Sequence, residues 1–100
     1  MFNTIVELLR SNGSIVVNKN LAKAVGLEEA VIYSELLSRF VYFKERNQLT
    51  ADGWFFNTIE DLQDGTTLNE YTQRKAIKHL EEIGLIQTQR RDIPAKRYFK

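Results

Sequence analysis

The sequence predicts an α+β domain that is mostly α-helical. Apolar residues recur at helical spacing over residues 27–45, and they do so again over residues 68–83. Residues 85–100 form two short runs on either side of a Pro-containing turn, which is the pattern of a β-hairpin. A chain of 100 residues has the length of one domain, so we expect a single domain over residues 1–100.

The composition is that of an ordinary globular protein, with 43% hydrophobic and 27% charged residues. The absence of Cys excludes disulfides and thiolate metal sites. The N-terminal stretch carries Glu7 and Arg10 and has no apolar run long enough for a signal peptide or a membrane span. We therefore expect a soluble cytoplasmic protein that does not bind a membrane.

The charges are divided unevenly along the chain. Residues 1–70 contain 6 Lys and Arg against 10 Asp and Glu, whereas residues 71–100 contain 8 against 3. A net charge of +1 for the whole chain conceals this asymmetry. A strongly positive segment indicates a polyanionic partner, and here the positive segment is the last third of the chain.

Two helices are predicted before the long central one. The first has its apolar residues at helical spacing and either closes the core or supplies a subunit contact; these residues are Phe2, Ile5, Val6 and Leu9. The second is a short helix that Asn18 caps and Gly26 ends.

The central helix is predicted over residues 27–45, where no helix breaker occurs. Its apolar residues cover well over a third of its circumference, so we expect it to be packed on two sides. A short strand is predicted over residues 54–56, with Trp54 in the core. Thr58 then caps a short helix of two turns, and Asp64, Gly65 and Thr66 form the turn that follows.

A longer helix is predicted over residues 68–83. Thr67 and Glu70 have the spacing of a capping box, in which each side chain accepts a hydrogen bond from a backbone N–H at the helix start. Gly84 can adopt the left-handed conformation that ends a helix, with Leu85 folding back on Leu80. Two helices joined by a short turn containing Gly make a helix-turn-helix unit.

The two faces of this helix differ in character. One is apolar, with Gln73 among Ala76, Ile77, Leu80 and Ile83, and the opposite one is basic with a single aromatic ring. The positive charge lies in the N-terminal half, the end that enters a DNA groove in helix-turn-helix proteins. Either this is a recognition helix, or the cations are only its solvated face. The residues of the basic face are Tyr71, Arg74, Lys75 and Lys78.

The predicted hairpin clusters four cations near its far end. Like charges near one exposed tip repel each other, so folding gives little reason to place them together, whereas a bound anion would supply one. These cations are Arg90, Arg91, Lys96 and Arg97.

A helix-turn-helix followed by a two-stranded hairpin is the winged-helix arrangement. Residues 54–100 resemble the winged-helix domains at the N-termini of plasmid and phage replication initiators and of DnaD-like primosomal proteins. Residues 18–40 look like the helical part that precedes the helix-turn-helix in those proteins. Family members usually continue into a C-terminal domain, so the resemblance implies that this chain is an N-terminal fragment or a truncated paralogue.

The resemblance implies double-stranded DNA binding during replication initiation. Helix 68–83 would lie in the major groove, and the wing, residues 85–100, would lie along the backbone. The eight cationic and aromatic positions named above become the DNA-binding residues. Gln73 departs from the family pattern, in which this position is commonly apolar, so the first turn of the helix could be rotated or could pack against a partner.

Specific binding would require a homodimer, because one small module makes few contacts. The alternative function is a winged helix that serves as an oligomerisation or docking module of a primosome and binds other replication proteins. A transcriptional regulator is a further alternative. We expect no enzyme, because His79 has no second His, Cys or phosphate-binding Gly run to accompany it. For the same reason we expect no cofactor, metal or small-molecule substrate.

Overall fold

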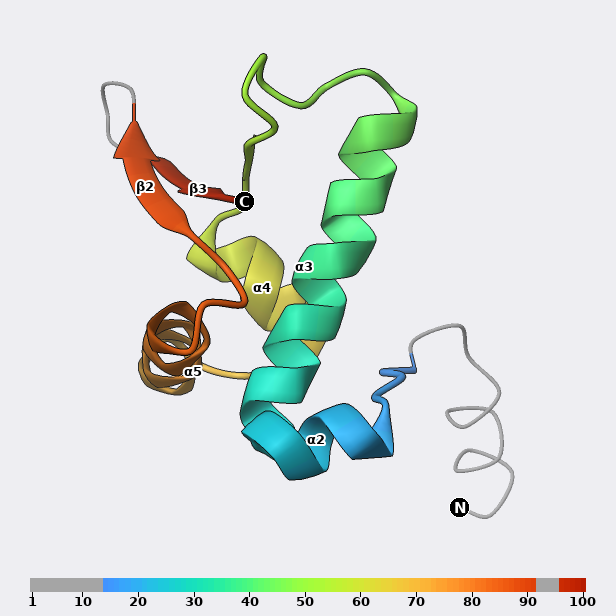
Figure 1. The fold of residues 1–100 in the computed structure, drawn as a ribbon, viewed down its shortest axis with the longest axis vertical. Helices are drawn as coiled ribbons and strands as arrows, with labels where there is room; N and C mark the ends of the chain where they lie inside the picture. The colour runs from blue at the N-terminus through green and yellow to red at the C-terminus, as the bar shows by residue number, and fades with distance from the viewer. Residues whose placement is uncertain (1–13, 92–95) are drawn as a thin grey trace, which may run out of the picture.

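The structure is a computed structural model that describes residues 14–91 and 96–100 (Figure 1). The predicted N-terminal helix, with Phe2, Ile5, Val6 and Leu9, lies outside the described residues. The described part is mostly helical with one small sheet, which confirms the predicted α+β class. Its elements are α2 (Lys19–Val25), α3 (Leu27–Glu45), β1 (Phe55–Phe56), α4 (Ile59–Thr66), α5 (Glu70–Glu82), β2 (Thr88–Arg91) and β3 (Lys96–Phe99).

The sheet has three antiparallel strands in the order β1-β3-β2. Strands β2 and β3 form the predicted hairpin, with Thr88 opposite Phe99. The sequence did not predict that β3 also pairs with β1, where Phe55 lies opposite Phe99. This pairing ties the wing to the strand between α3 and α4. Helix-turn-helix, hairpin and strand together form a winged helix.

Helix α3 is the centre of the fold and packs against α2, α4 and α5. Two of the apolar residues expected to be packed, Leu37 and Val41, are 50% and 43% exposed in the part of the chain that the structure describes. Trp54, predicted in the core, is only partly buried. The core consists of Ile32, Leu36, Phe55, Leu62, Ala76, Ile77, Leu80, Ile86 and Phe99.

The short helix α2 has the predicted ends. Asn18 Oδ1 accepts hydrogen bonds from the backbone N–H groups of Asn20 and Leu21, at 2.8 and 3.1 Å. Gly26 has a φ of 109°, which residues with a Cβ rarely adopt. Helix α3 therefore begins directly after α2, with only Gly26 between them.

Helix α4 begins at the predicted cap but extends further than predicted. Thr58 and Asp61 form the capping box. We expected Gly65 in the turn, but it lies inside α4, where a Cβ would collide with the carboxylate of Glu35 from α3. A side chain at position 65 would therefore require the carboxylate of Glu35 to move. The turn comes later and contains Thr67 in the left-handed conformation, with a φ of 65°.

Helix α5 begins two residues later than predicted, and its cap is a different residue. The predicted capping box of Thr67 and Glu70 is wrong, because the backbone N–H of Thr67 closes the end of α4 by donating to Gln63 O at 2.7 Å. Asn69 Oδ1 caps α5 instead.

The predicted end of α5 is confirmed. Leu85 N donates to Leu80 O at 3.0 Å and Gly84 N to Glu81 O at 3.1 Å, the two hydrogen bonds of a Schellman motif. Gly84 has the left-handed φ of 82° that the motif needs. Ile83, expected on the core face, is 46% exposed because the helix has already ended there. Among the described residues, no helix is long and apolar enough to cross a membrane.

Candidate nucleic-acid interface

The inner face of α5 fixes how the helix is rotated. Ala76, Ile77 and Leu80 are buried against the core, as predicted. Gln73 is also fully buried, and its Nε2 donates to Ile59 O at 3.1 Å and to Leu68 O at 2.9 Å. The polar residue at this position therefore faces the core and joins the first turn of α5 to the start of α4. The first turn is not rotated.

The outer face of α5 is exposed and basic. Tyr71 is 76% exposed, and the side chain of Arg74 is 62% exposed. Lys75 and Lys78 are also exposed. Helical spacing places these four residues on the face opposite the core stripe, as predicted. Tyr71 lies in the first turn, next to Glu70, whose carboxylate forms an ion pair with Arg74.

The ion pair of Glu70 with Arg74 was not predicted from the sequence, which assigns the carboxylate of Glu70 to a capping box. The spacing of four residues between an N-terminal Glu and a C-terminal Arg is the signal that could have found it, since such pairs stabilise helices. With Asn69 as the cap, the carboxylate of Glu70 is free to lie over Arg74.

The wing is attached to α5 at the helix end. Thr88, the first residue of β2, donates to Glu81 Oε2 from its backbone N at 3.2 Å and from its hydroxyl at 2.5 Å. In Figure 1, α5 and the β2–β3 hairpin lie on the same side of α3. Helix α5 and the wing are therefore neighbours in space.

Within the wing, Arg90 and Arg97 are Cα partners on adjacent strands. Directly opposed residues in an antiparallel pair project from the same side of the sheet. Arg90 is exposed, whereas Arg97 is partly buried with its guanidinium carbon 5.1 Å from the centroid of the Phe99 ring. The sequence predicted Arg97 at an exposed tip. This is wrong, because its side chain lies over the edge of the core.

The electrostatics of Arg97 connect the wing to α5. Burial lowers the pKa of Arg97 below its ordinary value, the positive charges of Arg90 and Arg74 lower it further, and Glu70 raises it. Arg90 is on the wing, whereas Arg74 and Glu70 are on α5. The structure thus brings together four charged residues from the two elements predicted to bind DNA.

Two of the predicted wing cations can be placed only by register. Arg91 and Lys96 are Cα partners at the far end of the hairpin, one residue beyond Arg90 and Arg97. Their side chains lie outside the part of the chain that the structure describes.

The single histidine has a structural role. His79 Nδ1 lies 3.2 Å from Glu29 Oε1, so it connects α5 to α3. Within residues 14–91 and 96–100, no group of three or more His, Cys, Asp or Glu side chains could hold a metal ion.

No protein-family model matches the chain, and no curated protein sequence matches it. Two solved structures are similar. One is described as the N-terminal domain of a DNA binding protein, with 19% sequence identity, a TM-score of 0.65 and coverage of 93% of this chain and 75% of that one. The other is described as the structure of the MDR initiator, with 20% identity, a TM-score of 0.61 and coverage of 94% and 79%. At these identities the similarity is one of fold, and the fold shared with them is a winged helix.

Proposed function

We propose that the chain binds double-stranded DNA, with α5 in the major groove and the wing along the sugar-phosphate backbone. The observation that carries the proposal is the junction of two basic surfaces. Arg74 on the exposed face of α5 lies near enough to Arg97 of the wing to act on it electrostatically, and Arg90 lies opposite Arg97. Cations on a helix and on an adjacent hairpin suit a ligand that is itself a continuous anionic track.

The residues of these two surfaces would make two kinds of contact with DNA. Lys75 and Lys78, and the wing cations, would neutralise phosphates, which supplies affinity without sequence preference. Tyr71 and Arg74 lie toward the N-terminal end of α5, which enters the groove most deeply in helix-turn-helix proteins. These two would contact base edges and sugars.

We further propose that the DNA is a replication origin and that the protein acts in the cytoplasm in replication initiation, on a plasmid or a phage genome. The similarity in fold to an initiator and to the N-terminal domain of a DNA-binding protein supports this role over that of a transcriptional regulator. A homodimer on a repeated or palindromic site would supply the contacts that one module lacks. The protein would act by binding, not as an enzyme.

Salt dependence tests DNA binding directly. With about four phosphates neutralised, affinity for a duplex should fall roughly a hundredfold between 50 and 200 mM salt. Fluorescence anisotropy on a random duplex and on an origin-repeat duplex, each at both salt concentrations, measures this. An affinity that does not change with salt would refute the proposal. Tighter binding to the repeat than to the random duplex is the result expected of an initiator.

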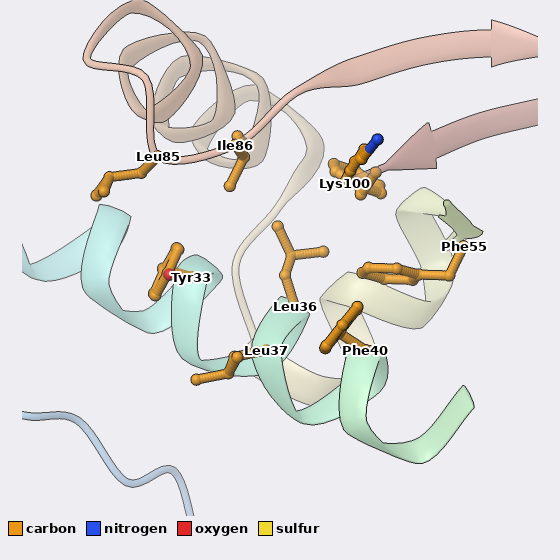
Figure 2. Close-up of a pocket in the computed structure, with 9 residues that line it drawn as sticks. Tyr33, Leu36, Leu37, Phe40, Phe55, Leu85, Ile86 and Lys100 are labelled. Carbon is orange, nitrogen blue, oxygen red and sulfur yellow. The ribbon is translucent and has the colours of Figure 1, made fainter. Parts of the chain in front are cut away.

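A second candidate function is assembly of subunits through α3. Leu37 and Val41 lie one turn apart on α3 and are both about half exposed. Beside them is an apolar groove of about 190 Å³ between α3 and the segment that leads into the wing (Figure 2). Large exposed apolar patches mark interaction sites in soluble proteins. The groove is lined by Tyr33, Leu36, Leu37, Phe40, Phe55, Leu85, Ile86, Phe99 and Lys100.

Light scattering after size exclusion separates the two functions. The wild type is compared with Leu37→Ser/Val41→Ser, which changes exposed positions and should leave the fold intact. If the wild type is a dimer, the variant is a monomer, and neither binds a duplex at low salt, assembly is the function. If both bind DNA at low salt, the DNA-binding function stands whatever the oligomeric state.

A further inference from the structure

The junction between the first turn of α5 and the wing holds an unusual group of charges. Glu70 pairs with Arg74 on the helix, and Arg90 lies opposite Arg97 on the wing. The charges of Glu70, Arg74 and Arg90 all act on the pKa of Arg97. Three arginines and one carboxylate leave a net positive charge. Like charges directly opposed across a strand pair destabilise a sheet, so folding alone does not account for the arrangement.

Arg97 has buried hydrogen-bond donors that lack an acceptor among the residues that the structure describes. Its Nε and Nη2 are buried and, within the described part of the chain, have no hydrogen-bond partner. The ring of Phe99 lies against the guanidinium. A buried donor without a partner costs free energy, and a charged one costs more. An anion with two acceptor oxygens that draws the guanidinium outward would remove that cost, because a guanidinium binds phosphate through paired hydrogen bonds.

Glu70 already supplies an anion at the same place. Its side chain is about half exposed and is held by Arg74. It also stabilises the charged form of Arg97. A carboxylate and a phosphate present similar oxygens to an arginine, so the two compete for Arg74. Breaking the internal ion pair costs free energy, so it weakens the binding of every ligand that must take the place of Glu70.

We propose that Arg97 holds one backbone phosphate of the duplex at this junction, and that Glu70, which pairs with the neighbouring Arg74 in the free protein, keeps Arg74 from the phosphates and thereby lowers the affinity for every duplex. The inference rests on the proposed DNA-binding function. It assigns to Glu70 a positioning role that opposes binding, and to Arg97 a stronger contact than those of the exposed lysines.

Removing the charge of Glu70 tests the competitor role. Glu70→Gln should tighten binding to random and origin-repeat duplexes alike by about threefold at low salt, the factor expected for releasing a partly exposed ion pair. The matched control is Glu28→Gln, which removes the same charge from the first turn of α3, where it is exposed. If Glu28→Gln tightens binding as much, the gain comes only from net charge, and the inference is wrong.

Replacing the guanidinium tests the anchor. Arg97→Lys keeps the charge but loses the paired hydrogen bonds, so affinity should fall at least about tenfold. Arg46→Lys is its control, because Arg46 also stacks on a ring, that of Tyr42 at 3.7 Å, but lies at the end of α3. The gain from Glu70→Gln should shrink in the Arg97→Lys background, since the two residues act on one phosphate. Equal gains in both backgrounds would overturn the proposal.

Two further results separate the failures. Should the wild type bind no duplex even at low salt, the DNA-binding function fails and this inference fails with it. Should it bind, with Glu70→Gln and Arg97→Lys matching their controls, only the inference fails. Melting temperatures in inorganic phosphate and in chloride at equal ionic strength address the source of the anion. A rise specific to phosphate that Arg97→Lys abolishes, together with a duplex affinity that Arg97→Lys leaves unchanged, would assign the junction to free phosphate and overturn the duplex assignment.

Discussion

Asn69 caps α5 by accepting a hydrogen bond of 2.9 Å from the backbone N–H of Thr72 to its side-chain Oδ1. The cap fixes the first turn of the helix, and so it determines where Glu70 and Tyr71 project. Because α5 starts at Glu70 and not at residue 68, Tyr71 is the second residue of the helix, and its exposed ring lies at the N-terminal end of the proposed DNA-binding face.

Asn69→Ala removes this cap and should lower the free energy of unfolding by about 1 kcal/mol. Urea denaturation followed by circular dichroism measures the change. Asn20→Ala is a suitable control, since Asn20 is an exposed residue inside α2 whose side chain has no capping position. A loss equal to that of the control would mean that Asn69 is not the cap.

Thr67 occupies the left-handed region, which is strained for a β-branched residue and tolerated by Asn. Thr67→Asn should therefore raise the free energy of unfolding by about 1 kcal/mol. Its side chain is exposed, so no packing is lost. The opposite sign, a loss of about 1 kcal/mol, is what a capping role for Thr67 would give. The same urea titration distinguishes the two signs.

Gln73→Met replaces the buried amide by an apolar chain of similar length. The change leaves the carbonyl oxygens of Ile59 and Leu68 without their side-chain donor, and we expect a loss of about 1 kcal/mol of stability. DNA affinity should be unchanged at temperatures well below melting, because residue 73 faces the core. Greater stability in Gln73→Met would show that the amide has no structural purpose.

Much of the fold follows from patterns within short segments. Gly26 and Gly84 ended helices as predicted, because each signal depends on a few neighbouring residues. The start of α5 could not be predicted in the same way. Two overlapping cap sequences, one at Thr67 and one at Asn69, compete there, and the choice is made by α4, which extends to Thr66 and leaves Thr67 as its own C-cap.

The candidate site was predicted in part. Helical spacing alone placed Tyr71, Arg74, Lys75 and Lys78 on an exposed face. The position of Arg97 required the strand register, because alternation along β3 puts it on the same side as the buried Phe99. A sequence reports that cations cluster near a turn, but only the pairing of β1, β3 and β2 shows which of them reaches the core edge.

The most direct test of the central claim is the salt dependence of duplex binding for Lys75→Ala/Lys78→Ala. These residues face water, so the melting temperature should hardly change. The control is Lys19→Ala/Lys23→Ala, which removes two exposed lysines about one helical turn apart from α2. If α5 carries the interface, the slope of log affinity against log salt becomes shallower by about 2 in the α5 variant and keeps the wild-type value in the control. Equal slopes for wild type and both variants would contradict the account.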